Sequence, residues 1–176
     1  MTGKPFLLFL LGAWCAATLF MWTVATQNFA VVERLLTEPS PEFAATTAPL
    51  PSEALRLTLR HQASEVNRLF FDGWGWVQIP IAALVLWLAW RSGSGKLVVI
   101  FASIMLLIVL ALQFHVVPET VRLGRILDFL PREPDPPEAA PFWRLHHAYT
   151  GLDMLKFLLA GGAALRLLRK TDSGHD

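Results

Sequence analysis

The chain has 176 residues, of which 54% are hydrophobic and 16% charged, with a mean hydropathy of +0.46 and a formal net charge of +1. This composition excludes an ordinary soluble domain and favours an integral membrane protein. The near-neutral charge, with no basic tail, excludes a nucleic-acid partner, and the single cysteine, Cys15, excludes an intramolecular disulfide.

The first apolar run predicts a transmembrane helix over residues 5–27. No charged residue occurs from Pro5 to Ala25, and at ~1.5 Å per residue this length crosses ~30 Å of hydrocarbon. A secretory signal peptide has a shorter apolar region and a small-residue cleavage site. A lipoprotein signal is also excluded, because Trp14 is too large for the position before a lipidated cysteine. We therefore expect this run to be retained in the membrane.

The first loop divides into two parts. Residues 38–52 are rich in proline and small residues and predict an extended loop. From Ser52, which can cap a helix, apolar and charged residues recur at helical spacing as far as Asp72, and this pattern predicts an amphipathic helix. Gly73 and Gly75 would allow a bend into a second span at residues 74–90, which is bracketed by tryptophans typical of membrane interfaces: Trp74, Trp76, Trp87 and Trp90.

The second half of the chain predicts two further spans. The six-residue turn at 91–96 makes the second span an antiparallel neighbour of a third at residues 97–115. Pro118 should kink or interrupt that helix before a second amphipathic segment, which is followed by a proline-rich stretch that predicts a stiff loop. A fourth span is expected at residues 147–168.

The expected fold is therefore all-α: a polytopic membrane four-helix bundle, left-handed and antiparallel, with amphipathic helical segments in the first and third loops. Residues 1–170 would form one transmembrane domain and residues 171–176 a polar tail. Basic residues near the span ends are concentrated in the short second loop and beside the two termini. The positive-inside rule then places both termini in the cytoplasm and the chain in the cytoplasmic membrane.

Two charged residues inside the fourth span are the main indication of a site. Asp153 and Lys156 lie one turn apart and can pair, which lowers the cost of burying each charge. His146, Tyr149 and Thr150 fall on the same helical face, so we expect this face to point into the bundle. It is either a structural stripe of interhelical hydrogen bonds or the lining of a functional cavity.

Other polar residues are expected at the same, non-cytoplasmic end of the bundle. They suggest a pocket that opens to that side, with these candidate residues: His146, Asp153, Lys156, Tyr149, Thr150, His115, Gln78 and Asn67. No cofactor is predicted from motifs, because metal-ligand spacings, nucleotide loops and nucleophile motifs are missing from the sequence. One alternative is haem b held between His115 and His146 on neighbouring spans.

The chain resembles the transmembrane protein 205-like family, whose bacterial members form the domain of unknown function 4149. The resemblance is clearest in Phe142-Trp143-Arg144-Leu145-His146 followed by Asp153, and weaker in Gly12, in Phe20 and in the segment Asn67-Arg68-Leu69-Phe70-Phe71. Asp153, where an uncharged amide is expected, and the additional His147 depart from the family pattern. The resemblance implies a four-helix integral membrane protein with no assigned reaction.

Three functional classes fit these observations. An accessory or scaffold subunit needs only a lipid-compatible bundle and a surface for a membrane-protein partner or a second copy of itself. A small transporter or small-molecule binder would use the polar pocket, and a haem-containing oxidoreductase would use the paired histidines. Because the sequence offers no nucleophile–base pair or metal-ligand set, we expect a non-catalytic component of a membrane complex, either an accessory or scaffold subunit or a small-molecule-binding component. A haem-binding oxidoreductase and a small transporter are the alternatives.

Overall fold

The computed structural model describes residues 3–130 and 135–172, and this part of the chain is all-helical, without strands. Its elements are α1 (Gly3–Thr37), α2 (Pro41–Thr47), α3 (Ser52–Arg91), α4 (Lys96–Ala111), the π-helix η1 (Leu112–Val116), α5 (Val117–Leu127) and α6 (Ala139–Asp172). Three continuous helices are long and apolar enough to cross a membrane: α1, α3, and the run from α4 to α5. The predicted helical class and membrane association are therefore confirmed.

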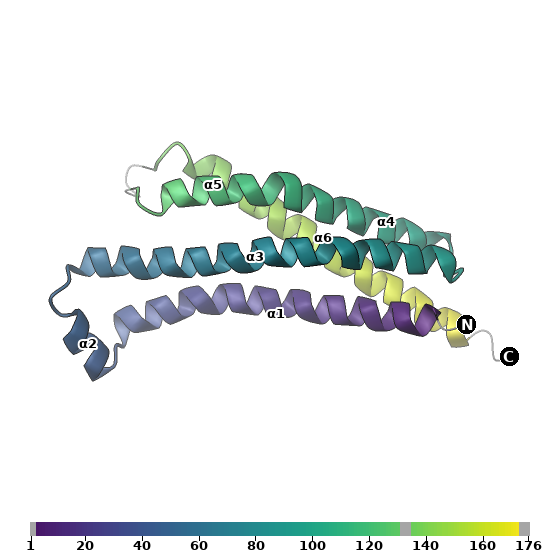
Figure 1. Cartoon of the computed structure of the whole chain (residues 1–176), viewed down its shortest axis with the longest axis horizontal. Helices are drawn as coiled ribbons and strands as arrows, with labels where there is room; N and C mark the ends of the chain where they lie inside the picture. Colours follow the sequence, from purple (N-terminus) through teal and green to yellow (C-terminus); the bar gives the residue numbers. More distant parts are fainter. Residues whose placement is uncertain (1–2, 131–134, 173–176) are drawn as a thin grey trace.

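The helices are much longer than a bilayer requires. With 35 residues in α1 and 40 in α3, the two helices measure ~52 and ~60 Å at ~1.5 Å per residue, against ~30 Å of hydrocarbon. Figure 1 shows them side by side along their whole length, joined by α2 at one end. Roughly 20 Å or more of each helix must therefore project beyond the hydrocarbon core.

Two details predicted for the first loop are wrong. The segment expected to be extended contains α2, because Ser40 accepts a hydrogen bond from the Phe43 backbone N–H (3.3 Å) and Pro41 occupies the first turn, where its missing N–H has no cost. Ser52 does not cap α3, since the N-cap position belongs to Pro51 and no side chain caps this end.

The predicted bend between the amphipathic helix and the second span is also wrong, because α3 runs unbroken through Gly73 and Gly75. A glycine inside a helix costs only about 1 kcal/mol relative to alanine, which packing against neighbouring helices easily offsets. The same helix contains Pro80, so it continues past a residue that cannot donate a backbone hydrogen bond.

The interruption predicted at Pro118 takes the form of the π-helix η1. The backbone N–H of Val117 bonds to the carbonyl of Leu112, five residues earlier, just before the proline that has no N–H to offer. The helix does not end here, so α4, η1 and α5 form one continuous helical run of 32 residues.

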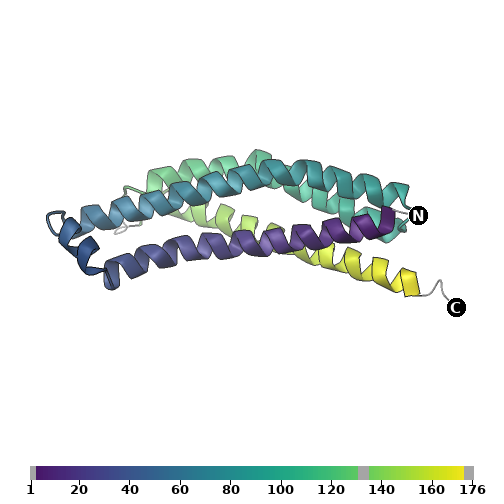
Figure 2. The ribbon, with the colours of Figure 1, turned by 60° about the horizontal axis from the view of Figure 1, so that its bottom comes forward.

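The four long helices pack in a ring, so that each contacts two neighbours. α1 contacts α3 and α6, and α4 contacts the same two helices. The apolar core lies toward the end of the molecule where α1 begins and α6 ends. Figures 1 and 2 show that these two helix ends lie at the same end of the bundle. Much of this core consists of small residues that let backbones approach closely, as membrane helices require: Ala82, Ala89, Ala102, Ala160 and Ala163.

The predicted stiff loop and polar tail fall partly outside the described residues, which exclude 131–134 and 173–176. α6 itself begins at Ala139 and is not among the helices apolar enough to count as spans by composition. Its buried face carries the charged pair Asp153 and Lys156.

Candidate functional site: an inner polar cluster and an outer ion cluster

Asp153 and Lys156 lie at the centre of an inner polar cluster, which also contains Gln78, Trp14 and Trp22. The Lys156 ammonium donates to Asp153 Oδ1 (2.5 Å) and to Gln78 Oε1. The second carboxylate oxygen of Asp153 accepts from Trp22 Nε1 (2.7 Å), and Gln78 Oε1 also accepts from Trp14 Nε1 (3.1 Å). The cluster thus connects α1, α3 and α6, and the predicted pairing of the two charges is confirmed.

The inner polar cluster is buried and dry. Asp153 is 2% exposed and Lys156 1% exposed, and the ammonium also lies 5.6 Å from the centre of the Trp14 ring, a cation–π contact. The cavity beside Lys156, lined by residues including Cys15 and Thr18, has no room for a water molecule. Each charge is therefore stabilised by protein groups alone, which is the condition for keeping an ion pair in a low-dielectric interior.

The rest of the predicted stripe on α6 does not join this cluster. His146 and Thr150 are exposed, and the Thr150 hydroxyl bonds to the His146 carbonyl of its own helix (2.9 Å). Tyr149 is half-buried, with its ring edge-on to Phe71 at 5.4 Å. The expectation that His146 faces the interior is wrong: His146 projects on nearly the same side of α6 as Asp153, but it lies seven residues, ~10 Å, nearer the start of the helix, where its side chain is exposed.

The remaining pocket candidates are separated as well. Asn67 accepts from the Asn28 amide (2.5 Å) and donates to the Ala25 carbonyl (3.1 Å), so it connects α3 to α1 at another level. His115 is exposed on η1, and no hydrogen bond or ring contact joins it to His146 among the described residues. Of the eight candidates, Asp153, Lys156 and Gln78 are joined directly by hydrogen bonds, and within the described part of the chain the other five form no hydrogen bond with these three.

A tight contact between α3 and η1 was not predicted. Gln113 is buried and donates to Asp72 Oδ1 (3.0 Å), but its own amide oxygen has no hydrogen-bond partner. That oxygen fills the space over Gly75, where an added Cβ would lie 1.7 Å from it. Gly75 is thus needed for close approach of the two helices, and not for a bend.

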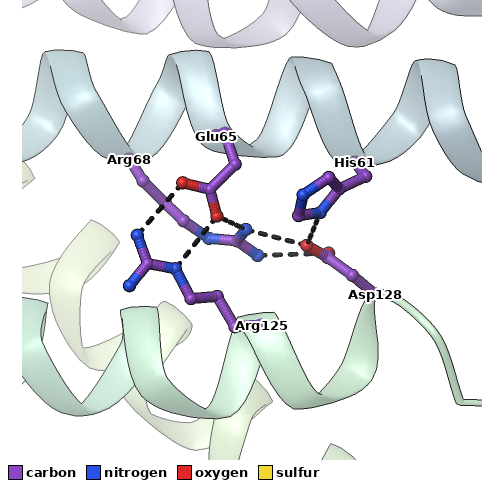
Figure 3. Close-up of polar contacts among 5 residues, drawn as sticks. All are labelled: His61, Glu65, Arg68, Arg125 and Asp128. Atoms are coloured by element: carbon purple, nitrogen blue, oxygen red, sulfur yellow. Dashed lines mark hydrogen bonds and ion pairs between the residues drawn. The ribbon is translucent and has the colours of Figure 1, made fainter.

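The outer ion cluster is the second polar group, and it lies between α3 and α5 (Figure 3). Arg68 donates to both oxygens of Asp128 (2.8 and 3.1 Å) and to Glu65 (2.6 Å). Arg125 donates to both oxygens of Glu65 (3.0 and 3.1 Å), and His61 Nδ1 lies 2.7 Å from Asp128 Oδ2. Hydrogen bonds and ion pairs therefore link two carboxylates and two guanidiniums between α3 and α5.

The outer ion cluster is not among the predicted site residues, although the sequence holds a local signal of it. His61, Glu65 and Arg68 recur at spacings of four and three on α3, and Arg125 and Asp128 are three apart on α5, so each set lies on one helical face. Neither face indicates its partner on the other helix. The turn between α3 and α4 sends the chain back along α3, so that α5 packs on α3 and the two faces meet.

Charge pairing in the outer ion cluster perturbs its ionisation. Hydrogen bonds from Arg125, then from Arg68, lower the pKa of Glu65 to about 2, and the same contact raises the pKa of Arg125. Arg68 and Asp128 are the inner members, with side chains only 13% and 12% exposed. Because the charged forms are mutually stabilised, the cluster holds α5 against α3 near neutral pH.

The outer ion cluster also contains a possible metal-binding set. One ligand atom from each of His61, Glu65 and Asp128 lies within 4.8 Å of the others. Both carboxylates, however, already bind arginine guanidiniums, whose positive charges would repel a cation. The donor set therefore does not suit a metal, and the cluster is an ion-pair network that joins α3 to α5.

Comparison with known proteins adds no assignment: no protein-family model, no curated protein and no solved structure matches the chain.

Proposed function

We propose that this protein is a four-span, non-catalytic accessory or scaffold component of the cytoplasmic membrane. In this proposal α6 is the fourth span, the four long helices form the membrane bundle, and both termini lie in the cytoplasm. Its task is to present the outer extension, defined as residues 28–72, 117–130 and 135–146, to a membrane-protein partner or to a second copy. The family resemblance stated above is compatible with this role.

The observation that carries the proposal is the length of the paired helices beyond the bilayer. α1 and α3 continue together past the apolar spans, and the outer ion cluster fixes α5 to this continuation. A pair of long helices that only crossed the membrane would need no such bracing. A braced helical extension is a suitable platform for docking, because little conformational entropy is lost when a rigid surface binds.

The outer extension also exposes large apolar side chains in addition to its charges. They include aromatic residues at the junction of α5 and α6, where Trp143 is 53% exposed and contacts the rings of Phe142, His146 and His147. Aromatic side chains are enriched at the centres of protein interfaces. We take this group as the docking region.

The dry inner polar cluster supports a structural role over transport. A transport pathway needs polar groups that face water or a substrate, whereas the buried charges here face one another in a closely packed interior. In this proposal the cluster fixes the relative positions of α1, α3 and α6 in the bilayer.

The test is photo-crosslinking from a site-specifically incorporated photoreactive amino acid in intact membranes. Placed at position 143, in the docking region, it should yield one discrete protein adduct, which mass spectrometry identifies as a partner or as a second copy. Placed at position 87, where Trp87 is equally exposed but lies in a span, it should yield lipid adducts only. Lipid adducts alone from both positions, with a monomeric purified protein, would refute the proposal. A stoichiometric haem band abolished by His115→Ala or His146→Ala would replace it with the oxidoreductase alternative.

A further inference from the structure

A groove lies between α4 and α6 at the opposite end of the molecule from the outer ion cluster. It encloses about 260 Å³ and is lined by Leu97, Phe101, Gly162, Leu165, Arg166 and Arg169. The groove is near the start of α4 and the end of α6, at the end where Figure 1 places both chain termini. In a bilayer this level corresponds to the boundary between acyl chains and headgroups.

The groove combines an apolar wall with basic residues. Leu97 and Phe101 are four residues apart on one face of α4, and Leu165 extends the apolar surface on α6. Gly162 lies against this wall, because a Cβ at this position would lie 3.2 Å from the Phe101 ring, and a larger side chain here would compete with a ligand for the space of the groove. Arg166 and Arg169 are three residues apart, so their side chains leave the helix on the same side.

We propose that this groove binds an anionic phospholipid, with the headgroup phosphate at Arg166 and Arg169 and the start of an acyl chain along Leu97 and Phe101. Guanidinium groups match phosphate oxygens in charge and in hydrogen-bond geometry. Basic pockets between membrane helices at the headgroup level are suited to anionic lipids, and the adjoining apolar wall favours an acyl chain over a soluble anion. The inference rests on the proposed four-span arrangement, in which α6 crosses the bilayer, but not on the accessory role.

The experiment is native mass spectrometry of the detergent-purified, delipidated protein. The probes are phosphatidylglycerol and phosphatidylcholine with identical acyl chains, and glycerol 3-phosphate as the soluble phosphate. The wild-type chain should retain phosphatidylglycerol in preference to phosphatidylcholine. The double variant Arg166→Gln/Arg169→Gln should lose roughly 25-fold in phosphatidylglycerol affinity, at about fivefold for each basic residue.

Two further variants separate the groove from general charge effects. Lys4→Gln/Arg91→Gln removes the same amount of charge at the same end of the bundle, since Gly3 lies against Ser92 of the turn between α3 and α4. This variant should still retain phosphatidylglycerol in preference to phosphatidylcholine. Gly162→Leu keeps all charges but fills the groove, and it should lose the bound lipid.

Each outcome decides the proposal. Equal retention of the two lipids by the wild-type chain would overturn it, as would an equal loss in Lys4→Gln/Arg91→Gln. Displacement of the lipid by glycerol 3-phosphate would overturn the lipid in favour of a soluble phosphate ligand. If Gly162→Leu fails to fold, Arg166→Gln/Arg169→Gln still decides. A missing protein adduct at position 143 would leave these lipid results unchanged, so the two proposals can fail independently.

Discussion

Removing one member of the buried Asp153–Lys156 pair should destabilise the protein more than removing both. In Lys156→Met the carboxylate keeps only the bond from Trp22, and a buried charge without its partner costs about 3–5 kcal/mol. In Asp153→Asn the ammonium keeps Gln78 and the Trp14 ring, so the loss should lie near the lower end of that range. The double variant buries no charge, and we expect it to lose less than about 2 kcal/mol, because mainly hydrogen bonds are lost.

The coupling free energy between the two positions should therefore be at least about 4 kcal/mol, with the double variant more stable than the sum of the single losses predicts. The measurement is unfolding by a denaturing detergent in mixed micelles, followed by tryptophan fluorescence, which is suitable because Trp14 and Trp22 belong to the cluster. Leu158→Ala, at a position 61% exposed on the same helix, is the control and should change stability little. Additive single losses, or a double variant less stable than either single variant, would refute the reasoning.

Three further predictions concern other parts of the molecule. The pKa of Glu65 is lowered to about 2 in the folded protein from an ordinary value of 4.5, so the stability that its carboxylate contributes is present above pH 4.5 and is lost as the pH falls toward 2. Glu65→Gln should therefore have a lower melting temperature than wild type at pH 7 and a similar melting temperature at pH 2. Gly75→Ala should lose about 1–3 kcal/mol in detergent unfolding, since its Cβ would overlap a buried glutamine amide. In a cysteine-free background, an impermeant thiol reagent applied to intact cells should label Ser52→Cys but not Lys96→Cys, both at exposed positions.

Each of these predictions has a contrary result that would count against it. A constant difference in melting temperature between wild type and Glu65→Gln from pH 7 to 2 would mean that the outer ion cluster does not stabilise the ionised carboxylate of Glu65. Gly73→Ala has open space around its Cβ, so it is the matched control for Gly75→Ala, and equal losses in the two would disprove the close-approach argument. Labelling of Lys96→Cys with protection of Ser52→Cys would reverse the proposed orientation.

The sequence by itself determined the helical class and the membrane association, because long uncharged runs satisfy every backbone hydrogen bond only as helices when water is absent. It also determined the Asp153–Lys156 pair, since residues three apart on a helix are neighbours whatever surrounds them. Predictions of this kind depend only on one helix and its solvent.

Tertiary structure decided which residues complete each cluster. Gln78 and Trp22 lie 78 and 131 residues from their partners on α6, and no periodicity within a helix indicates such distant contacts. His146 projects from α6 only about 20° away from Asp153, at ~100° per residue, but it lies seven residues, ~10 Å, nearer the start of the helix. Asp153 and Lys156 are buried against α1 and α3, whereas His146 is exposed, so its level along the helix separates it from the cluster. Helix formation is a local property of the chain, whereas the choice of partners depends on how the helices cross.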